Sequence, residues 1–127
     1  MGTISTTINL DKNLTVVKAT GKMTAEDFLQ WMEEYYAGSV TLFILWDICE
    51  ADVSDIRTED IVNGAQRLKK LAHLRYDGKT AVLTGQPLSY GLVRMLEAYS
   101  EMEGLAFGFK AFKSIDDAMV WLGIKDR

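Results

Sequence analysis

The stretch VTLFILWDI, residues 40–48, is apolar at every position except Thr41 and Asp47. A strand with one face in water alternates apolar and polar side chains, whereas a strand covered on both faces carries a nearly continuous apolar run. Residues 40–48 therefore predict a central strand with cover on both faces of its sheet. Parallel strands need a crossover connection, which is usually a helix, so the expected fold class is α/β.

Upstream of this stretch lie two segments rich in Ile, Val and Thr, namely Thr3–Leu10 and Leu14–Thr20. Three polar residues separate them, which is typical of a β-hairpin. Thr24 follows, with Asp27 three residues later, a capping pattern that opens a helix. The chain is therefore expected to begin with an antiparallel hairpin followed by a helix.

Downstream, helical and strand patterns alternate. Thr58 opens a helix, Lys79–Thr84 is a short apolar strand, and Leu88–Glu103 has helical periodicity. Leu105–Phe112 is a further strand, and Ser114 caps a final helix. The predicted order is ββαβαβαβα, a mixed and mostly parallel sheet with an N-terminal antiparallel hairpin and packed helices.

Composition limits the class of protein. The chain of 127 residues is 48% hydrophobic and 25% charged, as in globular proteins and unlike disordered ones. Pro87 is the single proline and no low-complexity stretch divides the chain, so we expect one domain over residues 1–127. The formal net charge of -4 argues against a nucleic-acid partner.

The amino-acid sequence shows no recognisable targeting signal. Cys49 is the single cysteine, so an internal disulfide and an oxidising compartment are not indicated. Residues 1–9 lack the basic and apolar blocks of a signal peptide, and the longest apolar run is far shorter than a membrane span. We therefore expect a cytoplasmic protein.

Catalytic groups are sparse. His73 has no evident orienting partner for general-base work, and Cys49 has no basic neighbour that would lower its pKa. One Cys and one His do not make a zinc site, so we expect no catalytic residue, metal or cofactor. The competing interpretation is a small enzyme that uses a divalent metal at the acidic end of the central strand. Its carboxylates would be Asp47, Glu50, Asp52, Asp55, Glu59 and Asp60.

Two further segments suggest binding. The basic residues Arg67, Lys69, Lys70, Arg75 and Lys79 cluster near the end of one helix. They either complement the helix dipole or meet an anionic partner or membrane surface. The helix at 88–103 has a bulky apolar stripe that fits ordinary core packing, a mobile lid over an apolar pocket, or a partner-binding face.

Four segments resemble the bacterial SpoIIAA-like family: ATGKMTAED (19–27), LWD (45–47), YGLVRMLE (90–97) and AMVWLG (118–123). Their likeness spans the chain from about Ile4 to Gly123. The resemblance implies a STAS-like fold and, more distantly, a likeness to the CRAL-TRIO lipid-carrying domains. It therefore implies two kinds of function, both non-enzymatic.

The CRAL-TRIO likeness implies an apolar or lipid-like small molecule beneath the movable helix 88–103, with peripheral contact at the inner membrane surface. Leu88, Leu92, Met95, Leu96, Tyr99 and Trp46 would line the pocket. Tyr90 and Val93 would lie on the membrane or partner face. This is the function that we expect.

The alternative implied by the resemblance is a STAS-type protein–protein regulator, similar to an anti-sigma-factor antagonist. Such regulators switch through a phosphorylated serine after the third strand, where this chain offers Ser54 and Thr58 but lacks the usual serine motif. A homodimer is a further alternative, because exposed aromatic side chains are typical of interfaces. Its candidate interface residues are Tyr35, Tyr36, Tyr90 and Trp121.

Overall fold

The computed structural model describes residues 2–38, 40–105 and 107–124, without the side chain of residue 72. Its sheet has five strands in the order β1-β2-β3-β4-β5. They are β1 (Thr3–Asn9), β2 (Leu14–Lys22), β3 (Phe43–Asp52), β4 (Lys79–Leu83) and β5 (Gly108–Phe112). β1 pairs with β2 in antiparallel fashion, and all the other neighbours are parallel. The predicted mixed sheet with an N-terminal hairpin is confirmed.

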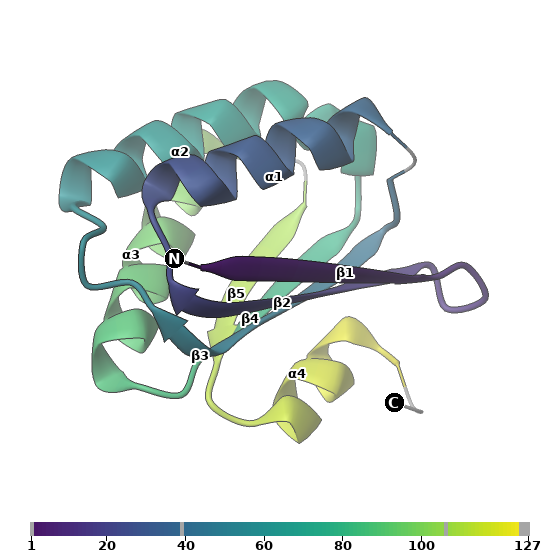
Figure 1. Cartoon of the computed structure of the whole chain (residues 1–127). Coiled ribbons are helices and arrows are strands. Elements are labelled where there is room, and N and C mark those ends of the chain that lie inside the picture. Colours follow the sequence, from purple (N-terminus) through teal and green to yellow (C-terminus); the bar gives the residue numbers. More distant parts are fainter. Residues whose placement is uncertain (1, 39, 106, 125–127) are drawn as a thin grey trace.

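Three helices cover one face of this sheet and the fourth covers the other (Figure 1). The first three are α1 (Ala25–Ala37), α2 (Thr58–Leu71) and α3 (Pro87–Glu103), and a 3₁₀ turn, η1 (Ala72–Arg75), follows α2. Strands β2 to β5 advance in one direction across the sheet, so right-handed crossovers bring all three connecting helices to the same face. The last helix, α4 (Ile115–Leu122), follows β5 and packs on the opposite face.

Local signals set the helix ends. Thr24 and Asp27 form a reciprocal capping box at the start of α1, with N···O distances of 2.9 and 3.2 Å. Ser114 accepts a hydrogen bond from the backbone N–H of Asp117 at the start of α4. Gly104 ends α3 with a positive φ of 69°. The predicted helix starts at Thr24 and Ser114 are confirmed, whereas β3 begins at residue 43 and β5 at residue 108, each three residues later than expected.

The central strand divides the core into two layers. Leu45 faces α4, where it packs with Ala118, Met119 and Leu122. The neighbouring residue Ile44 points to the other face of the sheet and belongs to the core beneath α1–α3. Strand β3 is therefore covered on both faces, as the apolar run predicted, and this arrangement places its side chains in the floor beneath three helices.

Candidate apolar site beneath three helices

A cavity of about 170 Å³ lies between the sheet and the helices α1, α2 and α3. Side chains of β3 contribute to its floor, among them Trp46 and Ile48, and Leu92, Val93 and Leu96 of α3 form one wall. Protein interiors are normally close-packed, with few voids larger than a water molecule. An apolar cavity of roughly 150 Å³ can stay dry and bind benzene, so this space is large enough for a small ligand.

Rigid aromatic rings and a missing side chain leave this space open. The Trp46 ring packs edge-on against Phe28 and Trp31, with ring centroids 5.4 and 4.7 Å away. On the far side α2 presents Gly64, and a Cβ added there would first meet Leu96 at an ordinary contact distance of 4.0 Å. The rings hold one another in place and the glycine has no side chain, so neither fills the centre of the cavity.

One end of the cavity is polar, because Arg75 lies there with 1% of its surface exposed. Its guanidinium donates to the carbonyls of Thr41, Leu42 and Lys79 at 2.7–2.9 Å. It also donates to the Thr80 hydroxyl at 2.7 Å and to the Tyr36 hydroxyl at 3.2 Å. All five N–H groups therefore have partners, and none of the partners is a carboxylate.

Buried hydroxyl groups extend this polar end. The Tyr35 hydroxyl accepts a hydrogen bond from the backbone N–H of Thr41 at 2.7 Å, and the Thr41 hydroxyl lies 2.8 Å from that of Thr15. Burial raises the pKa of Tyr36, although the charge of Arg75 opposes that shift. The sequence analysis missed this cluster. Thr41, a hydroxyl within an apolar run, was the one available signal.

The five basic residues near the end of α2 do not share one surface. Arg75 is buried, and the Lys79 ammonium donates to the carbonyl of Trp121 at 2.8 Å. Arg67 pairs with Glu33, and Lys69 pairs with Glu103. Arg75 and Lys79 are therefore not part of an exposed basic surface, whereas Arg67, Lys69 and Lys70 remain exposed and their contact with an anionic partner stays a prediction. The 3₁₀ turn after α2 directs Arg75 inward, and sequence spacing does not reveal such a turn.

Helix α3 presents a different face from the predicted one. Trp46, Leu92 and Leu96 line the cavity as expected, but so does Val93, which is buried and was predicted to lie on the membrane or partner face. Leu88 is 52% exposed. Met95 and Tyr99 are half-buried and do not line the cavity.

The inward stripe of α3 includes two serines, which explains this difference. Ser89 and Ser100 are each 2% exposed, and the Ser89 hydroxyl donates to the carbonyl of Gln86 at 3.0 Å. Among the described residues, the Ser100 hydroxyl is the buried side-chain group without a hydrogen-bond partner. Because the buried face of α3 includes two small polar residues, the large apolar residues of the helix do not by themselves mark that face. Met102, for example, is apolar but 79% exposed.

The aromatic residues predicted as candidates for a dimer interface already pack against other residues of the same chain. Tyr35 and Tyr36 belong to the core beneath α1. Tyr90 packs against the neighbouring core and lies under the Lys113 ammonium, 4.5 Å from its ring centroid. Trp121 packs against Phe112 on the opposite face of the sheet, with ring centroids 5.5 Å apart. These residues therefore do not form one shared surface.

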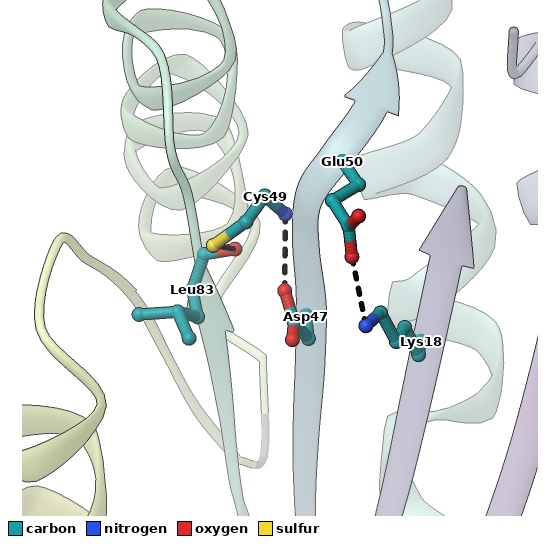
Figure 2. A network of polar contacts seen from close by, with 5 residues as sticks. All are labelled: Lys18, Asp47, Cys49, Glu50 and Leu83. Carbon is teal, nitrogen blue, oxygen red and sulfur yellow. Dashed lines mark hydrogen bonds and ion pairs between the residues drawn. The ribbon is translucent and has the colours of Figure 1, made fainter. Parts of the chain in front are cut away.

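The acidic end of β3 forms a separate polar network around a bulge (Figure 2). Asp47 accepts a hydrogen bond from the backbone N–H of Cys49 at 3.0 Å, and Glu50 pairs with Lys18 at 2.8 Å. Burial and the Asp47 carboxylate raise the pKa of Cys49 to about 11, which disfavours the nucleophilic thiolate. The described residues include no group of three His, Cys, Asp or Glu side chains placed to hold a metal.

The candidate phosphorylation sites lie at the surface, Ser54 just after β3 and Thr58 at the first position of α2. Ser54 and Thr58 are exposed, and the backbone N–H of Ser54 donates to Asp52 at 3.0 Å. Hydrogen bonds from Ser54 lower the pKa of Asp52, so this carboxylate is held in its charged form. Neither hydroxyl residue lines the apolar cavity.

The chain is similar to an uncharacterized protein from Shewanella loihica PV-4, of the DUF3478 family and with a SpoIIAA-like fold. The two share 24% sequence identity over 95% of this chain and 93% of that one, with a TM-score of 0.57. No family model and no curated protein matches the sequence. No helix among the described residues has the length and apolar character needed to cross a membrane. The predicted SpoIIAA-like fold is confirmed.

Proposed function

We propose that this protein is a non-enzymatic binding module that holds a small, neutral, apolar molecule beneath α1, α2 and α3. The cavity of about 170 Å³ is the observation that carries this proposal. Its lining is almost entirely apolar, and the buried cation at one end uses all its hydrogen-bond donors within the protein. A ligand therefore gains from apolar burial and shape, and not from a charged head group.

The size of the cavity narrows the ligand class further. It matches one aromatic ring or a short branched chain, by comparison with the roughly 150 Å³ cavity that accepts benzene. A longer lipid-like chain would require a helix to move. Peripheral membrane contact through Val93 is not part of the proposal, because that side chain is buried.

Helix α2 is a better candidate for the moving element than the expected helix, α3. Only Ile61 and Ala65 of α2 are fully buried, and exposed ion pairs from Arg67 and Lys69 join it to the neighbouring helices. Such pairs contribute about 0–1 kcal/mol each. In contrast, the Glu97 carboxylate of α3 accepts a hydrogen bond from the backbone N–H of Ala111 in β5, at 3.1 Å.

A cavity-filling variant tests the proposal. Toluene at ten times its Kd should stabilise the wild-type protein by about 1.4 kcal/mol, and so raise Tm by about 4 °C or more. Gly64→Leu places a side chain from α2 into the cavity, so toluene should no longer raise Tm. Differential scanning calorimetry with and without toluene measures both effects.

Gly91→Leu is the matched control. Gly91 is exposed on α3, and a Cβ added there meets nothing within 4 Å. Both substitutions bring the same gain of about 1 kcal/mol in helix propensity, but only Gly64→Leu fills the cavity. An unchanged toluene effect in Gly64→Leu, or none in the wild-type protein, would contradict the proposal.

A protein-binding regulator of the STAS type is a second candidate, favoured by the exposure of Ser54, just after β3, and of Thr58, at the start of α2. We expect intact-mass spectrometry of the protein purified from its own cells to show one added phosphate. The double variant Ser54→Ala, Thr58→Ala should lack that phosphate. If the phosphorylated wild-type protein binds a partner with the same affinity as the double variant, phosphorylation does not control binding and the switch is contradicted.

A further inference from the structure

We infer that the groove between the edge strand β1 and helix α1 binds an extended basic peptide, which joins the sheet as a further strand beside β1. The peptide segment would carry Lys or Arg at alternate positions. This groove is separate from the apolar cavity: it opens on the outer side of α1, at the edge of the sheet.

Strand β1 has an open edge. It stands at the end of the strand order, and among the described residues β2 is the one strand that pairs with it (Figure 1). In an antiparallel pair, alternate residues direct their N–H and C=O groups away from the partner, so β1 offers a row of free donors and acceptors. Its sequence, TISTTIN, has no charge and no proline, the residues by which natural proteins usually protect such edges.

A groove of about 610 Å³ runs along this edge. Its walls are side chains of β1 and α1, among them Ile4, Ile8, Trp31 and Glu34. The indole N–H of Trp31 donates to the Thr6 hydroxyl at 2.9 Å, which ties the helix to the strand. The Trp31 ring also stacks on Tyr35, with centroids 4.8 Å apart. The groove therefore has a rigid floor on which the aliphatic stems of Lys or Arg can pack.

Charge identifies the occupant of the groove. Helix α1 contains four acidic residues and no Lys or Arg, one of the acidic residues, Glu33, is paired with Arg67 of α2, and none of the described side chains that line the groove is basic. Asp27 and Glu34 stand at its rim, seven residues or about 10.5 Å apart along the helix. Same-face residues of a strand are about 6.8 Å apart, so long cations on an added strand can reach both carboxylates.

A second copy of the chain fits this edge less well. Two β1 strands paired about a two-fold axis normal to the sheet would bring both α1 helices to the same face, with their acidic outer sides toward each other. Like charges brought together at an interface are unfavourable. The charge of α1 therefore favours a basic peptide over self-association through β1.

Fluorescence anisotropy with labelled heptapeptides tests the inference. Thr-Arg-Thr-Arg-Thr-Arg-Thr should bind the full chain, and the same peptide with Glu in place of Arg should not. Two variants of the arginine peptide carry an N-methyl group on the backbone nitrogen of position 3 or of position 4, so each keeps every charge and loses one backbone donor. Alternate N–H groups of a strand face its neighbour, so one of these two donors points toward β1. The variant that loses this donor should bind at least about tenfold more weakly than the unmodified peptide, because strand addition depends on backbone hydrogen bonds.

Glu34→Lys should weaken binding of the arginine peptide about fivefold, the upper end of the effect of one exposed ion pair. Glu34 is exposed, with the Gln30 amide 3.5 Å away as its partner, so the fold should persist in circular dichroism. Glu101→Lys on α3 makes the same change of charge away from the groove and should bind like the wild-type protein.

Several results would overturn the inference. One is no binding of the arginine peptide at millimolar concentration, and another is binding of both N-methylated peptides as tight as that of the unmodified peptide. Equal affinities of Glu34→Lys and Glu101→Lys would show attraction to net charge alone. A dimer in sedimentation velocity that the arginine peptide does not dissociate would assign the edge to a second copy.

Discussion

Arg75→Ala is expected to lower the free energy of unfolding by about 3–5 kcal/mol, measured by urea denaturation. Arg75 is 1% exposed, and its guanidinium supplies five hydrogen bonds to groups on α1, on β4 and on the segment just before β3. Its loss leaves the carbonyls of Thr41 and Leu42 and the Thr80 hydroxyl without this donor. It also removes the cation that lies 4.6 Å from the centre of the Phe107 ring.

Two further variants separate charge from geometry at this position. Arg75→Lys keeps the charge but has three donors on one atom in place of a planar fork, so it should restore only part of the lost stability. Arg57→Ala removes an exposed guanidinium and should change stability by less than about 0.5 kcal/mol. Equal stabilities of Arg75→Ala and Arg57→Ala would show that the buried network does not stabilise the fold.

Trp46→Ala is expected to cost about 3 kcal/mol of stability and to change the size of ligand that the protein accepts. Trp46 joins the floor of the cavity to Phe28 and Trp31 through edge-on ring contacts. Its removal extends the cavity into the space of the indole. Naphthalene should then raise Tm of the variant more than it raises Tm of the wild-type protein, as calorimetry can measure.

Trp121→Ala is the matched control, because Trp121 packs against Phe112 on the opposite face of the sheet. This variant should lose stability without any gain in the naphthalene effect. The same gain in both variants would mean that naphthalene binds to loosened protein in general. No gain in a folded Trp46→Ala protein would mean that the cavity does not set ligand size.

Local signals were sufficient for the fold class. The capping residues Thr24 and Ser114 act within one helical turn, and Gly104 ends α3 through its own backbone conformation. The apolar run at 40–48 reports burial on both faces without reference to any partner. Such signals depend on a few adjacent residues, which is why the order of strands and helices could be predicted.

The candidate sites depended on tertiary packing instead. The face that α3 presents is set by its contacts with α2 and the sheet, so a helix with apolar residues on several sides did not reveal that Val93 is buried and Leu88 exposed. Arg75 is buried because carbonyl groups 33 and 34 positions earlier in the chain converge on it. No sequence spacing encodes that convergence.

The sequence by itself therefore determined the α/β class, the order of its elements and most of their ends, because these follow from periodicity and capping within short segments. Only the tertiary structure decided where the apolar cavity lies, which charge is buried beside it, and that an acidic helix borders an open strand edge. Those features exist where side chains from distant segments meet or fail to fill the space between them.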